Sequence, residues 1–205
     1  MLTPRRKSDT YHHGDLKSAA VLTGLKLIQN KGIHALGIRK VAEKISVTPA
    51  ALYRHFDDIE EFKIEISTEV SKQMAVLMTA RRDKVSKTTN KKDFALARFR
   101  AIGEAYLDFA RQEPKLFEIA FYCLSKPEIM DPENLDDQSW SILQESINEL
   151  VEAGLLAEAR FDDFSKFAWS AVHGLAILVS QGFIQEREYK QFKIAVLEGV
   201  KSSLG

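Results

Sequence analysis

Residues 38–56 read IRKVAEKISVTPAALYRHF and contain two short helical patterns joined by a tight turn. The first pattern spans Ile38 to Ile45, and its apolar residues recur at spacings of three and four, which places them on one face of a helix. The second begins at Thr48-Pro49, because a threonine hydroxyl caps a helix start and proline suits the first helical position. We therefore expect a helix-turn-helix at about residues 37–56, with its second helix running from Pro49 to Phe56.

The second helix of this motif is expected to present small and basic side chains away from its apolar side. Pro49, Leu52 and Phe56 share the inner face at helical spacing. Small residues on the opposite face let a helix approach the major groove, where an alanine methyl contacts thymine and an arginine reaches guanine or a phosphate. Other polar side chains can hydrogen-bond phosphates, which fixes the register without reading the sequence. The outward residues are Ala50, Ala51, Arg54 and His55, with Tyr53 at the edge, and Thr48, Tyr53 and His55 are the polar residues that can bind phosphates.

The charges of the chain are unevenly distributed, although its 205 residues have a formal net charge of zero. Residues 1–56 contain ten Lys or Arg and three Asp or Glu, a net charge of +7, so residues 57–205 carry −7. Four of the five histidines also lie in the first 56 residues. A basic segment ahead of a larger acidic one favours a polyanion as the partner of the N-terminal part.

The rest of the chain also shows helical patterns, and no stretch alternates in the way that a strand requires. Asp15 precedes a helical run that ends at Gly32, and Asp58 with Glu61 forms a capping-box pattern before the next helix. The polar stretch 125–138 indicates an acidic loop. The sequence predicts an all-α chain of about nine helices, with an N-terminal three-helix helix-turn-helix head and a larger C-terminal helical body.

Three N-terminal segments resemble the DNA-binding domain of the TetR (tetracycline-repressor) family of transcriptional regulators. They are His12-His13-Gly14-Asp15-Leu16, Arg39-Lys40-Val41-Ala42 and, most specifically, Val47 to Phe56. Nearer the C-terminus, Trp169, His173 and Gly174 resemble the Trp-His-Gly signature of one subclass of C-terminal domain. The resemblance implies a DNA-binding domain over residues 12–75 and a domain over residues 76–205 that binds a small effector and forms a homodimer.

The resemblance also implies a mode of action. The expected partner is double-stranded DNA with an inverted-repeat operator, because the two heads of a dimer enter successive major grooves about 34–36 Å apart. A small molecule would release a repressor by binding better to the DNA-incompetent state. We expect a cytoplasmic regulator without a cofactor. The candidate DNA contacts are Arg39, Thr48, Pro49, Ala50, Ala51, Tyr53, Arg54 and His55.

Two residues depart from the family pattern. Ser46 stands where the family usually has glycine in the turn, and a left-handed backbone at a serine costs on the order of 1 kcal/mol. Ile59 stands where the family often has a lysine that contacts a phosphate, a role that Lys63 could take instead.

The last two helices, at roughly 162–184 and 188–203, are expected to form the dimer interface. The first is apolar on more than one side, so a single packed face cannot cover it. The alternative is that it forms the central core helix of a monomer. One apolar face holds Phe164, Ala168, Ala171, Leu175 and Leu178, and another holds Phe167, Gly174, Ile177 and Ile184.

Aromatic residues of the body are expected mainly in its core, and in this architecture a few of them would also line an effector cavity. For His173, a hydrogen-bonded structural role and an effector contact both stay open. The candidate pocket residues are Tyr106, Phe109, Phe121, Trp140, Trp169 and His173.

Other classes of function have less support in the sequence. Adjacent His12 and His13 do not converge on one ion, and the single Cys123 rules out an internal disulfide and a cysteine-built zinc site. That cysteine is expected to be a buried thiol. The uncharged stretch from Phe167 to Gln185 contains polar residues and glycines, which favours a buried helix over a membrane span. No catalytic motif is present, so we expect no enzyme; an enzyme on a helical scaffold and an interaction protein are the alternatives.

Overall fold

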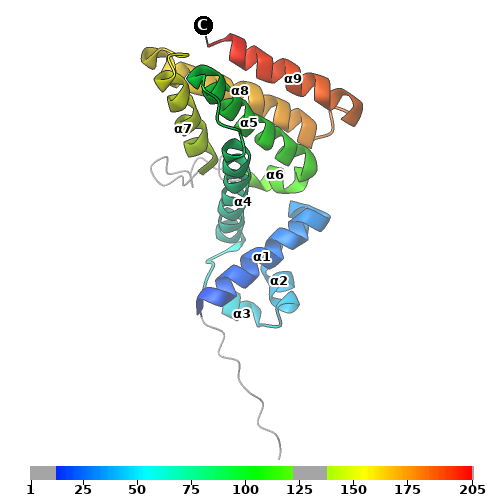
Figure 1. The fold of residues 1–205 in the computed structure, drawn as a ribbon. Coiled ribbons are helices and arrows are strands. Elements are labelled where there is room, and N and C mark those ends of the chain that lie inside the picture. The colour runs from blue at the N-terminus through cyan, green and yellow to red at the C-terminus, as the bar shows by residue number, and fades with distance from the viewer. Residues whose placement is uncertain (1–12, 122–137, 205) are drawn as a thin grey trace, which may run out of the picture. The chain divides into compact units, whose positions relative to one another are not determined.

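The computed structural model describes residues 13–121 and 138–204, and all regular structure within these ranges is helical (Figure 1). This confirms the predicted all-α fold. Two short 3-10 turns, Ile33–Ala35 and Glu158–Arg160, accompany the α-helices. The helices are α1 (His13–Lys31), α2 (Ile38–Lys44), α3 (Pro49–Leu52), α4 (Ile59–Asp83), α5 (Lys91–Gln112), α6 (Pro114–Ala120), α7 (Gln138–Glu152), α8 (Phe161–Ser180) and α9 (Glu186–Ser202).

The contacts divide the chain into two compact units, with the boundary inside α4. The N-terminal unit comprises the described residues up to Ile66, and the C-terminal unit begins at Ser67. Helices α1 to α3 and the first turns of α4 therefore belong to one unit. The rest of α4 and helices α5 to α9 belong to the other.

The N-terminal unit is held together by a small aromatic and aliphatic core. Leu52 and Phe56 are buried, and the Phe56 ring lies 4.6 Å from that of Phe62 between centroids. Gly24 of α1 lets α4 approach, because a Cβ there would come within 2.6 Å of Ile66 Cδ1. The aromatic residue that ends the helix-turn-helix is thus fixed by the first turns of α4.

Two helix boundaries in this unit differ from the sequence prediction. Helix α1 begins at His13 rather than after Asp15. Helix α3 ends at Leu52 rather than Phe56, because the chain tightens there: the amides of both His55 and Phe56 donate to the Leu52 carbonyl.

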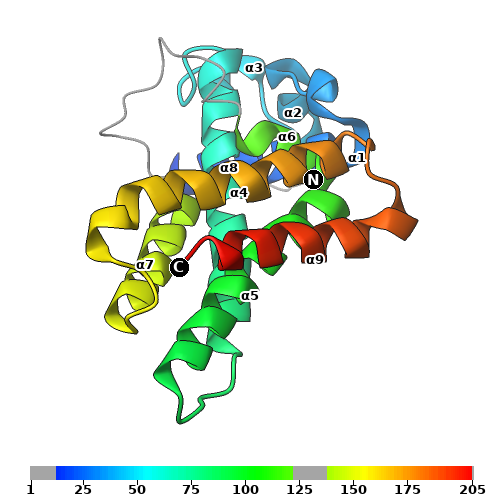
Figure 2. The same cartoon turned by 90° about the horizontal axis from the view of Figure 1, so that it is seen from above.

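The C-terminal unit is built around α5. This helix packs against α6, α7, α8 and α9, and α8 and α9 lie side by side (Figure 2). One buried apolar cluster joins α5, α7, α8 and α9 through residues that include Ala95, Ile147, Phe164 and Val200. An amphipathic helix placed at the centre of a bundle must bury more than one stripe, and most of the apolar residues of α5 are buried.

Asp108 ties three helices of this unit together. Its carboxylate accepts hydrogen bonds from Arg81 of α4 at 2.6 Å, and from Tyr189 and Lys193 of α9 at 2.6 and 3.0 Å. Burial acts to raise the pKa of Asp108, but these three hydrogen bonds outweigh it and hold the pKa below its ordinary value. Asp108 is therefore a charged junction between α4, α5 and α9.

The described residues bear on the question of a membrane span but not on every other prediction. No described helix combines the length and the apolar character needed to cross a membrane. The predictions for His12, Cys123 and the acidic loop fall outside the described residues, apart from Gln138, which begins α7.

Candidate functional site

The turn between α2 and α3 requires a left-handed residue. Ser46 has a φ of 58° and is the only non-glycine residue with positive φ in the described chain. The Ser46 amide donates to the Glu43 carbonyl and the Val47 amide to the Ala42 carbonyl, at 3.1 and 3.0 Å. The turn therefore does need a left-handed backbone, and a serine adopts it at the position where the family usually has glycine.

Side-chain caps fix where α3 and α4 begin. Thr48 Oγ1 accepts a hydrogen bond from the Ala51 amide at 3.3 Å, and Pro49 occupies the first turn. At the start of α4, Asp58 Oδ1 accepts from the amides of Glu60 and Glu61, both at 2.8 Å. Both caps were predicted from the sequence and are confirmed.

Most of the candidate DNA contacts lie on the surface of the N-terminal unit. Tyr53 is half exposed, and Ala51 and His55 are partly buried. Pro49 is exposed, which corrects its predicted place on the inner face: the helix has only begun there, and Leu52 and Phe56 alone reach the core. The exposed candidates are Arg39, Thr48, Pro49, Ala50, Tyr53 and Arg54.

Positive charge on α2 and beyond α3 is not neutralised by neighbouring side chains. Arg39, Lys40 and Arg54 are exposed and form no ion pair with any described residue. Lys63, by contrast, donates to Glu60 at 2.9 Å. Lys40 was not among the predicted DNA contacts, although its position beside Arg39 in the sequence indicated it. These cations are available to an external anion.

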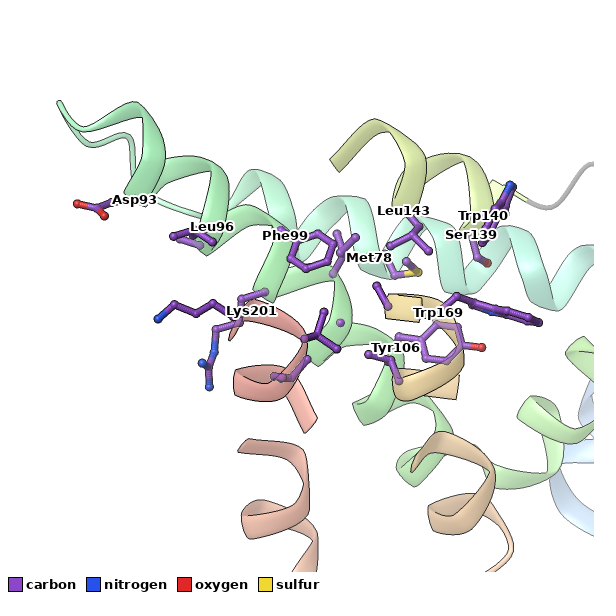
Figure 3. Close-up of a pocket in the computed structure, with 18 of the residues that line it drawn as sticks. Met78, Asp93, Leu96, Phe99, Tyr106, Ser139, Trp140, Leu143, Trp169 and Lys201 are labelled. Carbon is purple, nitrogen blue, oxygen red and sulfur yellow. The ribbon is translucent and has the colours of Figure 1, made fainter. Parts of the chain in front are cut away.

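A cavity of about 290 Å³ lies in the C-terminal unit (Figure 3). Of the six candidate pocket residues, Tyr106, Phe121, Trp140 and Trp169 line it, whereas Phe109 and His173 do not. Sequence reasoning missed its aliphatic wall, because residues facing a cavity have the same spacing as residues facing the core. That wall includes Met78, Leu96, Leu143, Val172 and Val200.

His173 contacts three of the residues that line the cavity, Tyr106, Phe121 and Trp169. Its Nδ1 pairs with the Tyr106 hydroxyl at 2.7 Å. Its ring stacks on Trp169, with centroids 5.0 Å apart and planes 18° apart, and meets Phe121 edge to face at 4.7 Å. His173 thus lies behind the cavity wall and fixes how Tyr106 and Trp169 face it.

The charged residues of the cavity wall form a rim away from its tryptophans. Asp93 and Lys201 lie toward the end opposite Trp140 and Trp169 (Figure 3), and Arg100 lies about midway between Asp93 and Tyr106 on α5. Arg100 donates to Glu104 at 2.9 Å and also to Glu198, and Lys201 lies 3.6 Å from Glu198. The two cations of the rim are therefore already paired with carboxylates.

Helices α8 and α9 expose apolar side chains on the surface of the C-terminal unit. Leu178, expected on the buried face of α8, is exposed, whereas Ile177 and Ile184 are only partly exposed. A Cβ added at Gly174 or Gly199 would meet no atom within 4 Å. The large exposed apolar residues of α8, α9 and the turn between them are Phe167, Leu178, Phe183, Phe192 and Ile194. An exposed apolar surface of this kind is typical of an interaction site.

Acidic, histidine and cysteine side chains do not gather into a metal-binding cluster anywhere in residues 13–121 and 138–204.

Two family models match this chain. One, described as the tetracyclin repressor-like C-terminal domain, matches residues 99–193. The other, described as bacterial regulatory proteins of the tetR family, matches residues 21–66 and so includes the helix-turn-helix. Together the two matches cover more than half of the chain. The Trp-His-Gly subclass stays a prediction, since neither description specifies it.

Similar proteins agree with these matches. The HTH-type transcriptional regulator YobS of Bacillus subtilis (strain 168) is 23% identical over 167 residues, covering 80% of this chain and 78% of the relative. A protein of unknown function from Rhodococcus sp. RHA1 has a TM-score of 0.78 at 19% identity, covering 96% of this chain and 98% of that one. A TetR-family transcriptional regulator from Pectobacterium atrosepticum has a TM-score of 0.65 at 18% identity, covering 98% and 94%. At such identities the solved structures show a shared fold.

Proposed function

The chain belongs to the TetR family of transcriptional regulators and is a DNA-binding regulator, and from this premise we propose that it is a repressor released by a small molecule. In this proposal residues 12–75 bind an inverted-repeat operator, and residues 76–205 bind the effector and form the homodimer. The family points to regulation rather than catalysis, and we propose no cofactor. Because its target is DNA, the protein acts in the cytoplasm.

The observation that carries the DNA-binding proposal is the contrast between the two sides of the helix-turn-helix. Leu52 and Phe56 are buried, whereas Arg39 and Arg54 are exposed and unpaired within the described chain. In this proposal Arg54 reads a base or contacts a phosphate, and Ala50 contacts a thymine methyl. Thr48, Tyr53, His55 and the other candidates position the helix on the phosphates.

The exposed apolar surface of α8 and α9 supports the proposed dimer. Phe167 and Phe192 are each more than two-fifths exposed, which is costly for phenylalanine in water. A second copy of the same surface would bury both, and exposed Gly174 and Gly199 would let the helices of two subunits approach closely. The resulting four-helix interface is a self-complementary two-fold contact.

The cavity supports the proposed effector site. It is enclosed largely by apolar and aromatic side chains with few polar groups, as ligand sites usually are. Met78, which lines it, belongs to α4, the helix whose first turns hold Phe56. An effector releases DNA only if it binds the DNA-incompetent state more tightly. It must therefore contact at least one residue whose position differs between the two states.

A gel shift on the DNA upstream of the chain's own gene tests the proposal. We expect specific binding whose log affinity falls with log salt by about 0.9 for each phosphate contacted. Arg54→Ala should weaken binding, whereas Lys84→Ala should not, although both remove one exposed positive charge. Binding that ignores salt, or that responds equally to both variants, would refute the proposed interface.

A further inference from the structure

The shape and chemistry of the cavity wall identify a class of ligand. Resting on the proposed function of this cavity as the effector site, we propose that the effector is an uncharged, elongated, apolar molecule with a planar ring at one end that carries a hydrogen-bond acceptor. Three features of the cavity support this ligand class: its length, the positions of its charged residues and the aromatic residues at its far end.

The cavity is elongated along α5. Residues of this helix line it from Asp93 to Tyr106, at spacings of three and four. At 1.5 Å per residue this stripe is about 20 Å long. Figure 3 shows Asp93 and Lys201 toward one end and Trp140, Trp169 and Tyr106 toward the other, with Phe99 and Leu143 between them. A compact ligand would leave much of this wall uncovered.

The described part of the wall provides no free cation for an anionic ligand, and its one acid lies far from the aromatic residues. Its Asp, Glu, Lys and Arg side chains are Asp93 at one end of the α5 stripe, Arg100 about midway along it, and Lys201. Arg100 and Lys201 are held by Glu198, and Arg100 also by Glu104. With these carboxylates counted, the rim carries three acids and two bases, so it does not attract an anion. Among the described residues of the wall, Asp93 is the only acid, and it lies about 20 Å along α5 from Tyr106.

A charged group at the aromatic end would lose its hydration without gaining an ion pair from a described residue. In the middle it would meet Arg100 and Lys201, whose charges carboxylates already neutralise. Aromatic faces attract a cation too weakly to offset the loss of its hydration. The wall therefore favours an uncharged ligand over either ion.

The aromatic end is built for a flat ring. Trp140 and Trp169 meet edge to face, with centroids 6.1 Å apart. Trp169 is held in place by its stack on His173, which in turn pairs with the Tyr106 hydroxyl. No described residue accepts a hydrogen bond from the Trp169 indole N–H. A planar ring can lie against these side chains, and an acceptor on it would receive that hydrogen bond.

The two tryptophans provide the assay, because they are the only two in the chain and both line the cavity. The full chain would be titrated with 4-hexylacetophenone, 4-hexylbenzoate and (4-hexylphenyl)trimethylammonium, following tryptophan fluorescence and binding heat. These probes share a ring and a tail and differ in charge. We expect the uncharged ketone to bind at least tenfold more tightly than either ion. Equal or tighter binding of an ion, or no binding of any probe, would overturn the proposal.

Two variants show whether the binding site is this cavity. Leu143→Phe fills part of the wall and should weaken ketone binding at least tenfold, whereas Asn148→Phe, at an exposed position of the same helix, should not. Trp169→Phe keeps a ring but removes the N–H, so it should weaken the binding of 4-hexylacetophenone more than the binding of hexylbenzene, which has no acceptor. If the binding of both probes were weakened equally, the proposed hydrogen-bond acceptor on the ring of the effector would be refuted. Circular dichroism would establish that each variant folds.

The ligand class and the repressor function can fail separately. If the ketone binds as expected but leaves the gel shift unchanged, the ligand class stands and release by an effector at this cavity is wrong. If an ion binds more tightly and releases DNA, the effector site stands and the ligand class is wrong.

Discussion

Replacing Ser46 by glycine should stabilise the N-terminal unit. Ser46 has a φ of 58°, in the left-handed region, where a Cβ clashes with the backbone at a cost of about 1–2 kcal/mol. Glycine removes this clash, but it also gives the unfolded chain more conformational entropy, which lowers the free energy of unfolding by about 0.5–1 kcal/mol. Ser46 is exposed and its side chain makes no hydrogen bond within the described residues, so no contact is lost. The expected net gain is about 0.5–1 kcal/mol.

The two units can be followed separately during thermal unfolding. Both tryptophans lie in the C-terminal unit, so their fluorescence reports on that unit, whereas circular dichroism at far-ultraviolet wavelengths reports on all helices. For a unit of this size, the gain corresponds to a rise in melting temperature of about 2–8 °C. We expect this rise in the part of the dichroism transition that fluorescence does not follow.

Matched substitutions separate the backbone effect from other causes. Ser46→Ala keeps the Cβ, so it should change stability by less than about 0.5 kcal/mol. Gly32→Ala makes the opposite change at a φ of 81°, where a Cβ would meet no atom within 4 Å, and should destabilise the unit by about 1–2 kcal/mol. If Ser46→Gly lowered stability, or if Ser46→Ala raised it as much as glycine did, left-handed strain would not be the cause.

Three further predictions concern the DNA contacts, the dimer and the charged junction. Arg54→Ala should weaken DNA binding by about 1–3 kcal/mol per site in gel shifts while the fold stays intact. Phe56→Ala should instead destabilise the N-terminal unit by about 3–5 kcal/mol in thermal melts. Phe192→Glu, on the exposed surface of α9, should yield a folded 23.2 kDa monomer in sedimentation; a wild-type chain that is already monomeric at micromolar concentration would contradict the proposed dimer. The folded pKa of Asp108 is lowered, so its contribution to stability is present above its ordinary pKa of 3.8 and is lost as the pH falls through the lower folded value. Asp108→Asn should therefore cost roughly 2 kcal/mol at neutral pH and flatten the acid limb in denaturant melts, and an unchanged acid limb would show that the junction is not responsible.

The helix-turn-helix could be predicted in detail because its signals are local. A hydroxyl cap, a proline and a left-handed turn act within a few residues, and the contacts of Thr48, Asp58 and Ser46 are those expected. The end of α3 could not be predicted in this way. There the Phe56 ring packs against Phe62 of α4, and the amides of His55 and Phe56 both donate to the Leu52 carbonyl in a tighter turn.

The cavity was less accessible to sequence reasoning. Apolar periodicity identifies a face that avoids water, but it does not say whether another side chain or an empty volume lies opposite. Leu143 and Val172 therefore resembled core residues although they line the cavity. The same limit explains Leu178, whose spacing from Phe164 fits the buried stripe of α8 although its side chain is exposed.

Helix α9 has consequences for how effector preference can be altered by evolution or design. One of its sides contributes Leu197 and Val200 to the cavity, and its other side exposes Phe192 and Gly199. A substitution that enlarges residue 197 would push against Gly103, where even a Cβ would lie 2.8 Å from Leu197, and a shift of the helix would move both of its sides. A mutation on the α9 wall would therefore rarely change ligand preference alone. Libraries that seek a new specificity should vary the α5 and α7 walls and leave α9 unchanged.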